Sequence, residues 1–254
     1  MDIDSYDHGV PSWVDLGTPD PARAASFYGE LFGWSVEPGP PEAGGYALAE
    51  LRGKPVAGIG PQQNPGPPVW ATYVNVDSAD DVAAKVTANG GTLFMDPFDV
   101  MDVGRMAVFA DPQGAAIGLW EPKAHKGAGI VNEPGTYSWS ELVTTDVDAA
   151  KAFYAAVFGW GEKTNGGYTE WQLGGRSIAG AMAKPAEMPS EVPPFWGVYF
   201  AVDDTDAAVA RVTELGGAQI MPPMDIEPGR FAVLADPQGA SFNVIKMNEG
   251  LAQT

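Results

Sequence analysis

The sequence predicts an α+β fold built from four βαβββ units, with two units in each half of the chain. Three observations lead to this fold class. The landmark residues of the first half return in the same order in the second half, each half alternates strand-like and helix-like segments, and each half closes with an Asp-Pro-Gln-Gly turn between two apolar runs. A chain of 254 residues is long enough for two domains of ordinary size.

The repeat has a spacing of 126 residues over its first part, since Trp139 follows Trp13 and Trp160 follows Trp34 at that distance. A polar, glycine-rich stretch separates the two copies and is typical of a linker. We therefore expect an N-terminal tail over 1–10, a first domain over 11–122, a linker over 123–135, a second domain over 136–248 and a C-terminal tail over 249–254.

The first unit begins with a strand, because the segment 12–17 alternates and places Trp13 and Asp15 on one face. Asp20 is a suitable N-cap for a helix that ends at Gly33. A hairpin with strands over 46–51 and 55–59 is expected next, because turn residues separate two short apolar runs.

The second unit repeats this order with a strand over 72–76 and a helix that starts after Ser78, for which Ser78 and Asp81 form a candidate capping box. Three extended segments follow the helix. The last two, over 106–110 and 115–120, flank a turn in which Pro112 and Gly114 occupy the positions that a type I turn favours.

Cysteine is absent from the sequence, which excludes disulfides, thiolate nucleophiles and Cys-ligated zinc or iron–sulfur centres. No apolar run approaches the length of about 18 residues that a membrane span needs. The first eleven residues are acidic and polar, whereas a signal peptide is basic and then apolar. We therefore expect a cytoplasmic protein with no membrane partner.

The acidic balance of the chain disfavours nucleic acid as a partner. The sequence has 33 acidic and 14 basic residues and a formal net charge of -19, which repels phosphate backbones. A neutral or cationic small molecule stays compatible with this charge, and so does the simpler interpretation that surface acid keeps the protein soluble. A homodimer is also compatible with the sequence.

The ordered landmarks resemble those of the vicinal oxygen chelate superfamily, which includes glyoxalase I, bleomycin-resistance proteins and extradiol dioxygenases. The matching features are an Asp-capped helix with Phe-Tyr that ends near Phe-Gly-Trp, a second strand and helix with Val-Asp and Gly-Gly, and the closing Asp-Pro-x-Gly hairpin. They cover nearly the whole chain in both copies. The resemblance implies two tandem half-barrel domains, each with a concave face, or cup, that holds a ligand and often one divalent metal.

The metal positions implied by this resemblance carry no metal ligands in either copy. Members with a metal have His or Gln on the first strand of the domain and Glu on its last strand. The matching positions here are Trp13 and Trp139 on the first strands and Gly118 and Asn243 on the last.

The other strands that could contribute ligands, near Ala71 and Gly197 and over 55–60 and 177–182, contain no His, Asp or Glu. His8 and His125 lie in the leading tail and the linker. A catalytic divalent ion needs three or four converging ligands, so the sequence predicts no metal. Neither a phosphate-binding glycine loop nor a Ser–His–Asp arrangement fits the predicted elements, and we expect no cofactor.

One carboxylate in each copy is expected to face the cup, because Asp15 lies two residues after Trp13 on the same strand and Glu141 matches it. On an apolar wall such a group has a raised pKa, and it either acts as a general base or pairs with a cationic ligand. The alternative is a structural carboxylate held by Arg105 or Arg230, arginines that could instead bind a ligand's carboxylate or phosphate.

Six large aromatic side chains are candidates for ligand contact, although such residues also fill cores. They are Trp13, Tyr46, Trp70, Trp139, Tyr168 and Trp196.

Three functions follow from these residues, in order of preference. The first is a metal-free protein of the bleomycin-resistance type that binds or sequesters a small organic ligand in aromatic-lined cups. The second is a metal-independent lyase, isomerase or hydroxylase-like enzyme that acts on a small carbonyl or oxygenated metabolite, with Asp15 or Glu141 as the base. The third, a metal-dependent glyoxalase or dioxygenase, comes last because its central ion has no ligands.

Overall fold

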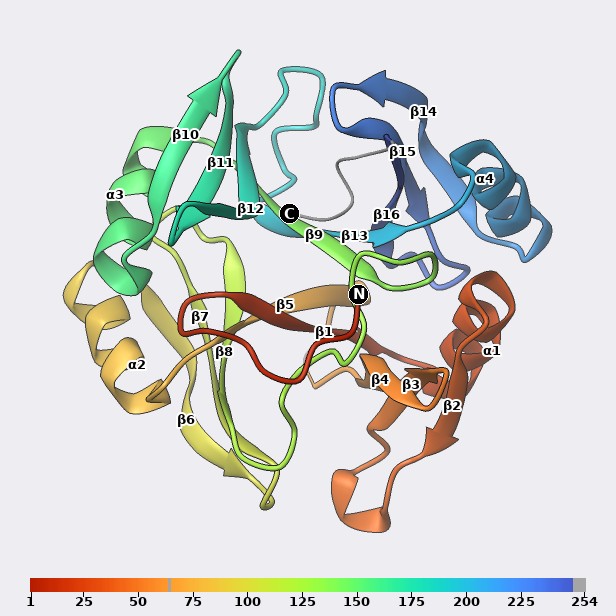
Figure 1. Cartoon of the computed structure of the whole chain (residues 1–254), viewed down its shortest axis with the longest axis horizontal. Helices are drawn as coiled ribbons and strands as arrows, with labels where there is room; N and C mark the ends of the chain where they lie inside the picture. Colours follow the sequence, from red (N-terminus) through yellow and green to blue (C-terminus); the bar gives the residue numbers. More distant parts are fainter. Residues whose placement is uncertain (64, 249–254) are drawn as a thin grey trace.

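The computed structural model describes residues 1–63 and 65–248, and the predicted C-terminal tail over 249–254 lies outside the described residues. Within them, each half of the chain forms one eight-stranded mixed sheet and two α-helices, which confirms the α+β fold with a tandem repeat (Figure 1). The two sheets have the same strand order, β2-β3-β4-β1-β5-β8-β7-β6 and β10-β11-β12-β9-β13-β16-β15-β14.

The elements of the first half are β1 (Pro11–Thr18), α1 (Pro21–Phe32), β2 (Ser35–Pro38), a 3₁₀ turn (Pro41–Ala43), β3 (Ala47–Leu51), β4 (Lys54–Pro61), β5 (Val69–Asn75), α2 (Ala79–Ala88), β6 (Thr92–Val100), β7 (Gly104–Ala110) and β8 (Ala116–Pro122). The elements of the second half are β9 (Tyr137–Thr144), α3 (Val147–Phe158), β10 (Gly161–Asn165), β11 (Tyr168–Leu173), β12 (Arg176–Ala183), β13 (Phe195–Ala201), α4 (Thr205–Glu214), β14 (Ala218–Ile226), β15 (Gly229–Ala235) and β16 (Ser241–Met247).

Helix α1 begins and ends where the sequence predicts. The Asp20 carboxylate accepts a hydrogen bond of 3.0 Å from the backbone N–H of Arg23, and Gly33 closes the helix in the left-handed conformation with φ of 76°. Asp146 and Gly159 cap α3 in the same way. The duplicated caps therefore set the same helix length in both halves.

The predicted type I turn between β7 and β8 is also confirmed. The backbone N–H of Gly114 donates to the carbonyl of Asp111 over 2.9 Å. The buried Asp111 carboxylate also accepts hydrogen bonds from the backbone N–H groups of Gln113 and Ala115. Asp236 makes the matching bonds in the second half, so both aspartates are structural residues of their turns.

The two halves share their core, because the helix-covered face of each sheet packs against the other half. Helices α1 and α4 lie side by side, and so do α2 and α3 on the opposite flank (Figure 1). Phe32 of α1 contacts Phe200 and Phe242 of the second half, with ring centroids 5.1 Å and 6.3 Å away. Apolar burial of this kind is the main stabilising term of a fold.

Strand parity separates this shared core from the opposite face of each sheet. On β1 and β5 the buried Leu16 and Trp70 are paired and face the helices, whereas Asp15 and Tyr73 lie on the other face. We call the helix-free face of the first sheet cup 1 and that of the second sheet cup 2. Cup 1 carries Trp13, Asp15, Tyr46, Tyr73, Met106 and Gly118, and cup 2 carries Trp139, Glu141, Tyr168, Tyr199, Phe231 and Asn243.

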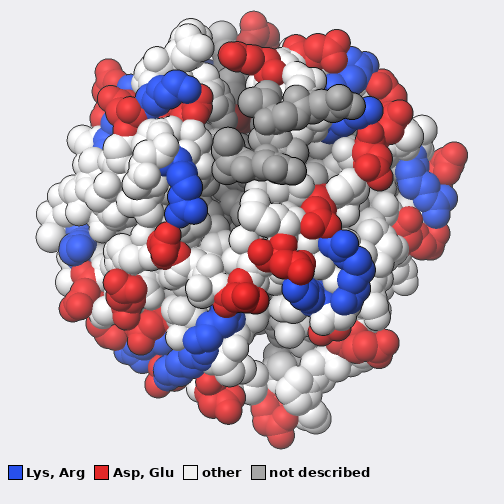
Figure 2. Space-filling view, in the orientation of Figure 1, with Lys and Arg blue, Asp and Glu red and all other residues white. Residues whose placement is uncertain are grey.

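The charged residues of the surface are mixed in sign. On the face drawn in Figure 2, Lys and Arg side chains are scattered among Asp and Glu side chains with uncharged surface between them. This face therefore presents no continuous basic surface for a phosphate backbone. In the described part of the chain, no helix combines the length and the apolar composition needed to cross a membrane.

Candidate ligand-binding site

The centre of cup 1 is a carboxyl group bound by phenols. Asp15 lies on β1, which pairs with β4 of its own unit and β5 of the next, and the Tyr46 hydroxyl donates to its Oδ2 over 3.2 Å. The Tyr73 hydroxyl bonds the same carboxyl from β5. Trp13 Nε1 in turn donates to Tyr46 Oη over 3.0 Å, which holds that phenol in place. The structure thus brings Trp13, Asp15 and Tyr46 together.

Cup 2 repeats this arrangement around Glu141. The Tyr199 hydroxyl donates to Glu141 Oε1 over 3.0 Å, and the Tyr168 hydroxyl bonds the same carboxyl. Trp139 Nε1 donates to Tyr168 Oη over 3.0 Å. Each half therefore has one half-buried carboxyl between two phenols, one of which is fixed by an indole.

Glycines beneath these tyrosines make the arrangement sterically possible. A Cβ at Gly58 of β4 would overlap the hydroxyl of Tyr46, and a Cβ at Gly180 of β12 would overlap that of Tyr168. Strand β4 next to β1, and β12 next to β9, therefore need a glycine at the position where the phenol ring crosses the strand.

Burial dominates the electrostatics of both carboxyls. It raises the pKa of Asp15 to about 7, and the hydrogen bonds from Tyr46 and Tyr73 offset only part of that rise. Burial likewise raises the pKa of Glu141. The same burial, together with the neighbouring carboxyl, raises the pKa of Tyr46 and Tyr199 well above 10, so that these phenols stay protonated and donate.

Apolar side chains that keep part of their surface accessible lie on the same sheet face as each carboxyl. Phe98 in cup 1 is 40% exposed and Met224 in cup 2 is 45% exposed, and each is paired across the strands with an inward-facing partner. The further partly exposed members are Met95, Met106 and Val108 in cup 1 and Met182, Met221 and Phe231 in cup 2. Accessible Met and Phe side chains form adaptable surfaces for apolar ligands.

A divalent metal does not fit the donor groups of either cup. In the described ranges, no three His, Cys, Asp or Glu side chains come together. The ring of Tyr73 occupies the space where a side chain at Gly118 would be, and Asn243 uses its Nδ2 to donate to the carbonyl of Val198 over 3.1 Å. One carboxylate per cup is below the three or four ligands that such an ion needs.

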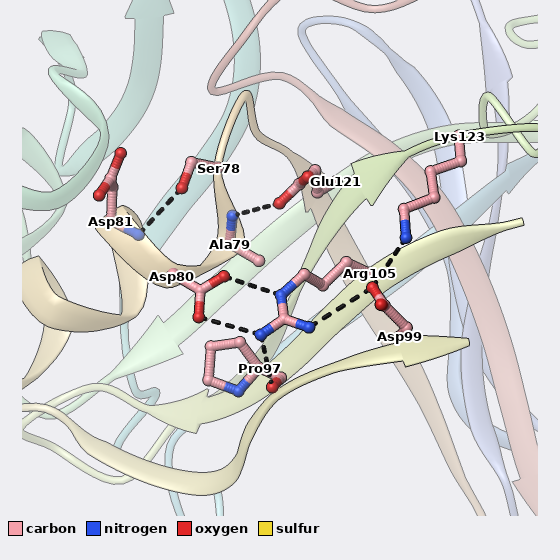
Figure 3. Close-up of polar contacts among 9 residues, drawn as sticks. All are labelled: Ser78, Ala79, Asp80, Asp81, Pro97, Asp99, Arg105, Glu121 and Lys123. Carbon is pink, nitrogen blue, oxygen red and sulfur yellow. Dashed lines mark hydrogen bonds and ion pairs between the residues drawn. The ribbon is translucent and has the colours of Figure 1, made fainter. Parts of the chain in front are cut away.

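Arg105 lies outside the cup and pairs with carboxylates other than Asp15. It makes a bidentate ion pair with Asp80 at the start of α2, with distances of 2.8 Å and 3.0 Å, and contacts Asp99 at 3.4 Å (Figure 3). On β7 the Arg105 side chain lies on the helix side of the sheet. This corrects the two roles predicted for it, namely pairing with Asp15 and binding an acidic group of a ligand. It ties α2 to the edge hairpin.

Arg230 repeats this ion pair in the second half, and the prediction for it is corrected in the same way. Its guanidinium binds both oxygens of Asp206 at 2.7 Å and 3.0 Å and contacts Asp225 at 3.0 Å. Its bonds to Asp206 of α4 place it on the helix side of the sheet, opposite the face that carries Glu141.

Trp70 and Trp196 also lie away from the cups, contrary to the prediction that they contact ligand. Trp70 is 3% exposed, and its Nε1 donates to the Tyr28 hydroxyl in the shared core. Trp196 is 5% exposed and bonds Tyr154 in the same way. Each tryptophan lies three positions before the cup-facing tyrosine of its strand, and an odd offset places the two side chains on opposite faces.

Tyr73 and Tyr199 are the site residues that sequence reasoning missed. They are 126 residues apart, as are Trp13 and Trp139, and both lie on the strand that pairs with the first strand of their half. The repeat spacing combined with strand parity is the signal that would have found them.

The linker brings a histidine to cup 1 that the predicted elements did not place there. The ring centroid of His125 lies 4.3 Å from that of Trp13 and 5.5 Å from that of Trp120. Burial lowers the pKa of His125 to about 4, so the ring is neutral near pH 7. Its Nε2 is buried without a hydrogen-bond partner among the described residues. His8 is bound elsewhere, since its Nδ1 accepts a hydrogen bond from the backbone N–H of Asp77.

Comparison with known proteins agrees with this fold. A family model described as "Glyoxalase-like domain" matches the chain twice, over residues 13–119 and 141–245. The chain is 46% identical over 254 residues to the protein named "Putative glyoxylase CFP32" of Mycobacterium tuberculosis, covering 95% of this chain and 96% of that one. It is 40% identical over 262 residues to the anthracycline biosynthesis protein DnrV of Streptomyces peucetius, with coverages of 95% and 94%.

Solved structures share the fold at low identity. The 2,3-dioxygenase LapB from Pseudomonas sp. KL28 superposes with a TM-score of 0.67 at 13% identity, covering 94% of this chain and 93% of that one. The Mn(II)-bound glyoxalase from Novosphingobium aromaticivorans gives a TM-score of 0.63 at 18% identity, with coverages of 95% and 85%. At such identities the likeness extends to the fold alone.

Proposed function

The chain belongs to the family of glyoxalase-like domains, and we propose that it binds a small aromatic organic molecule in its cups without a divalent metal. The observation that carries this proposal is the carboxyl between two phenols in each cup, on a sheet face that also carries accessible Met and Phe side chains. A mostly apolar wall with a few convergent polar groups is the usual composition of a small-molecule site.

The polar centre favours a ligand that donates hydrogen bonds or carries a positive charge. With a pKa of about 7, Asp15 is present in both protonation states near neutral pH. A cationic group near the carboxyl favours the ionised form and gains a charge-assisted hydrogen bond. The names of two relatives, DnrV and DauV, link them to anthracycline biosynthesis, which supports an aromatic ligand class.

A second candidate is a metal-independent lyase or isomerase, and the raised pKa of Asp15 favours it. A carboxylate with a pKa near the working pH is suited to general base catalysis. In such a reaction Asp15 would take a proton from a carbon next to a carbonyl, and a phenol would donate to the enolate oxygen that forms. The proton would then return to another atom of the substrate.

Titration calorimetry with an anthracycline that has a free amine, and with the same compound N-acetylated, tests the proposal. We expect saturable binding that is tighter for the amine, and loss of that preference in the double variant Asp15→Asn/Glu141→Gln. Glu162→Gln, which removes a carboxylate on β10 that pairs with Lys151, is the matched control.

Two results would contradict the binding proposal: no heat with either compound, or an amine preference that survives the double variant. Turnover separates the enzyme from the binding protein. If the wild type converts a small carbonyl compound and the double variant slows this step by orders of magnitude, the second candidate replaces the first.

A further inference from the structure

We propose that cup 2 is the ligand site of this chain and that Asn243 sets its specificity, an inference that rests on the proposed function. The ligand class is an aromatic molecule with a hydroxyl or a protonated amine that donates hydrogen bonds. Two differences between the cups carry the inference, namely the cover over cup 1 and the side chain opposite the tyrosine of β5 or β13.

The linker covers cup 1 at the indole of Trp13. It crosses the end of the first sheet, where the backbone N–H of Ala128 donates to the carbonyl of Ser12 over 2.8 Å (Figure 1). The N–H of Gly129 donates to Pro55 over 2.7 Å, and that of His125 donates to Val103 over 2.9 Å. The linker is therefore bonded to β1, to β4 and to the turn that precedes β7.

A left-handed glycine allows this close approach. Gly127 has φ of 106°, and a Cβ there would lie 2.6 Å from the carbonyl oxygen of Ser12. Next to it the His125 ring meets Trp13 edge-on, with planes 80° apart. As a result Trp13 is 3% exposed, whereas its counterpart Trp139 keeps an accessible surface.

The second difference lies at the last strand of each half. In cup 1 Gly118 pairs with Tyr73, whose ring fills the space above the glycine. In cup 2 Asn243 pairs with Tyr199 and occupies the matching position. The Tyr199 ring lies beside Phe231 instead, with centroids 6.2 Å apart.

Asn243 adds a hydrogen-bond acceptor that cup 1 does not have at this position. Its Nδ2 donates to the carbonyl of Val198, which fixes the carboxamide and leaves Oδ1 as the acceptor. With Glu141 on the same face, cup 2 presents two acceptors to a ligand donor. A site built to accept such hydrogen bonds rejects analogues that lack the donor.

Calorimetry with the anthracycline amine tests the inference. We expect one molecule bound per chain. The affinity should fall at least about tenfold in each of the variants Glu141→Gln and Asn243→Gly. Glu162→Gln, in the same half but outside the cup, is expected to keep the wild-type affinity. Far-UV circular dichroism and melting temperature verify that each variant is folded.

Two equivalent sites per chain, or a single site that persists at full affinity in both cup 2 variants, would overturn the inference while the proposed function stands. Absence of any binding by the wild type contradicts the proposed function itself, so the two failures are distinct.

A measurement without ligand tests the cover over cup 1 separately. We expect Trp139→Phe to remove a larger share of the acrylamide-quenchable fluorescence than Trp13→Phe, because the linker shields the indole of Trp13. The reverse order would show that cup 1 is the more open one and would overturn the assignment.

Discussion

At the scale of single residues, the carboxyls of Asp15 and Glu141 are the most consequential groups of this molecule. Each lies in a cup whose wall is mostly apolar, where burial favours the neutral form. The phenols that bond Asp15 compensate only part of that effect. The fold thus maintains a group at its centre that is unfavourable when ionised, which is typical of a functional position.

The raised pKa of Asp15 predicts how stability depends on pH. Between pH 3.8 and about 7 the folded protein retains a proton that the unfolded chain has released, so the free energy of unfolding falls as pH rises through this window. Asp15→Asn removes this dependence and is expected to gain stability relative to wild type from pH 4 to pH 7, by no more than roughly 4 kcal/mol.

Urea unfolding of both proteins at several pH values measures this difference. Parallel stability curves for the variant and the wild type would contradict the raised pKa. Above about pH 8 the difference should approach a constant value, because Asp15 is then mostly ionised in both states.

Gly58 predicts a steric effect at the same site. In Gly58→Ala the new methyl group collides with the Tyr46 hydroxyl, and we expect a loss of about 1–3 kcal/mol of unfolding free energy. Gly17→Ala is the matched control, because a Cβ there meets only Gln62 at 3.6 Å. Equal losses in the two variants, measured by urea unfolding, would show that Tyr46 does not occupy the space above Gly58.

The sequence predicts part of this site and misses part of it for a physical reason. Asp15 and Glu141 follow from alternation along one strand, which is a local property. The aromatic character of Trp70 alone predicts ligand contact, whereas the parity of its strand places it in the core. His125 reaches cup 1 through backbone bonds of the linker, and no periodic pattern encodes such contacts.

At the scale of elements, local signals predict the helices and the closing turns. Asp20 and Gly33 mark the ends of α1, and Asp111 forms its turn through its own backbone neighbours. The edge strands are harder to predict, since β2 has no buried residue and β6 contains a bulge between Leu93 and Met95. Neither strand has a buried apolar face, on which strand prediction depends.

The N-cap of α1 predicts a local contribution to stability. Asp20→Ala removes the side-chain acceptor for the N–H of Arg23, and the expected loss is about 1 kcal/mol of unfolding free energy. Asp203→Ala, which changes an exposed aspartate just before the cap of α4, should cost clearly less. Chemical denaturation of both variants measures the difference, and an equal effect would argue against the cap.

At the scale of the whole molecule, each half completes the other. The Tyr28 hydroxyl donates to Asp236 of the second half over 3.2 Å, and the Tyr154 hydroxyl donates to Asp111 of the first half over 3.1 Å. Between these points Thr72 and Ser140 bond across the interface at 2.7 Å. These reciprocal buried bonds align the two sheets and join their cores.

Removal of the reciprocal bonds should destabilise the protein as one unit. In Tyr28→Phe the Nε1 of Trp70 and the carboxylate of Asp236 lose a buried partner, and we expect a loss of about 1–3 kcal/mol. Tyr6→Phe, which removes one bond to the carbonyl of Ala128, should cost less. Scanning calorimetry should show one transition at a lower temperature, whereas an unchanged melting temperature would argue against the joint core.

The joint core also has a consequence for biosynthesis. The aromatic side chains of α1 leave the ribosome long before Phe200 and Phe242, which cover them in the native state. At translation rates of about 5–20 residues per second, the 168 residues from Phe32 to Phe200 take roughly 8–34 s. During that interval the nascent first half exposes apolar surface, so its yield in cells should depend on chaperones that bind nascent chains.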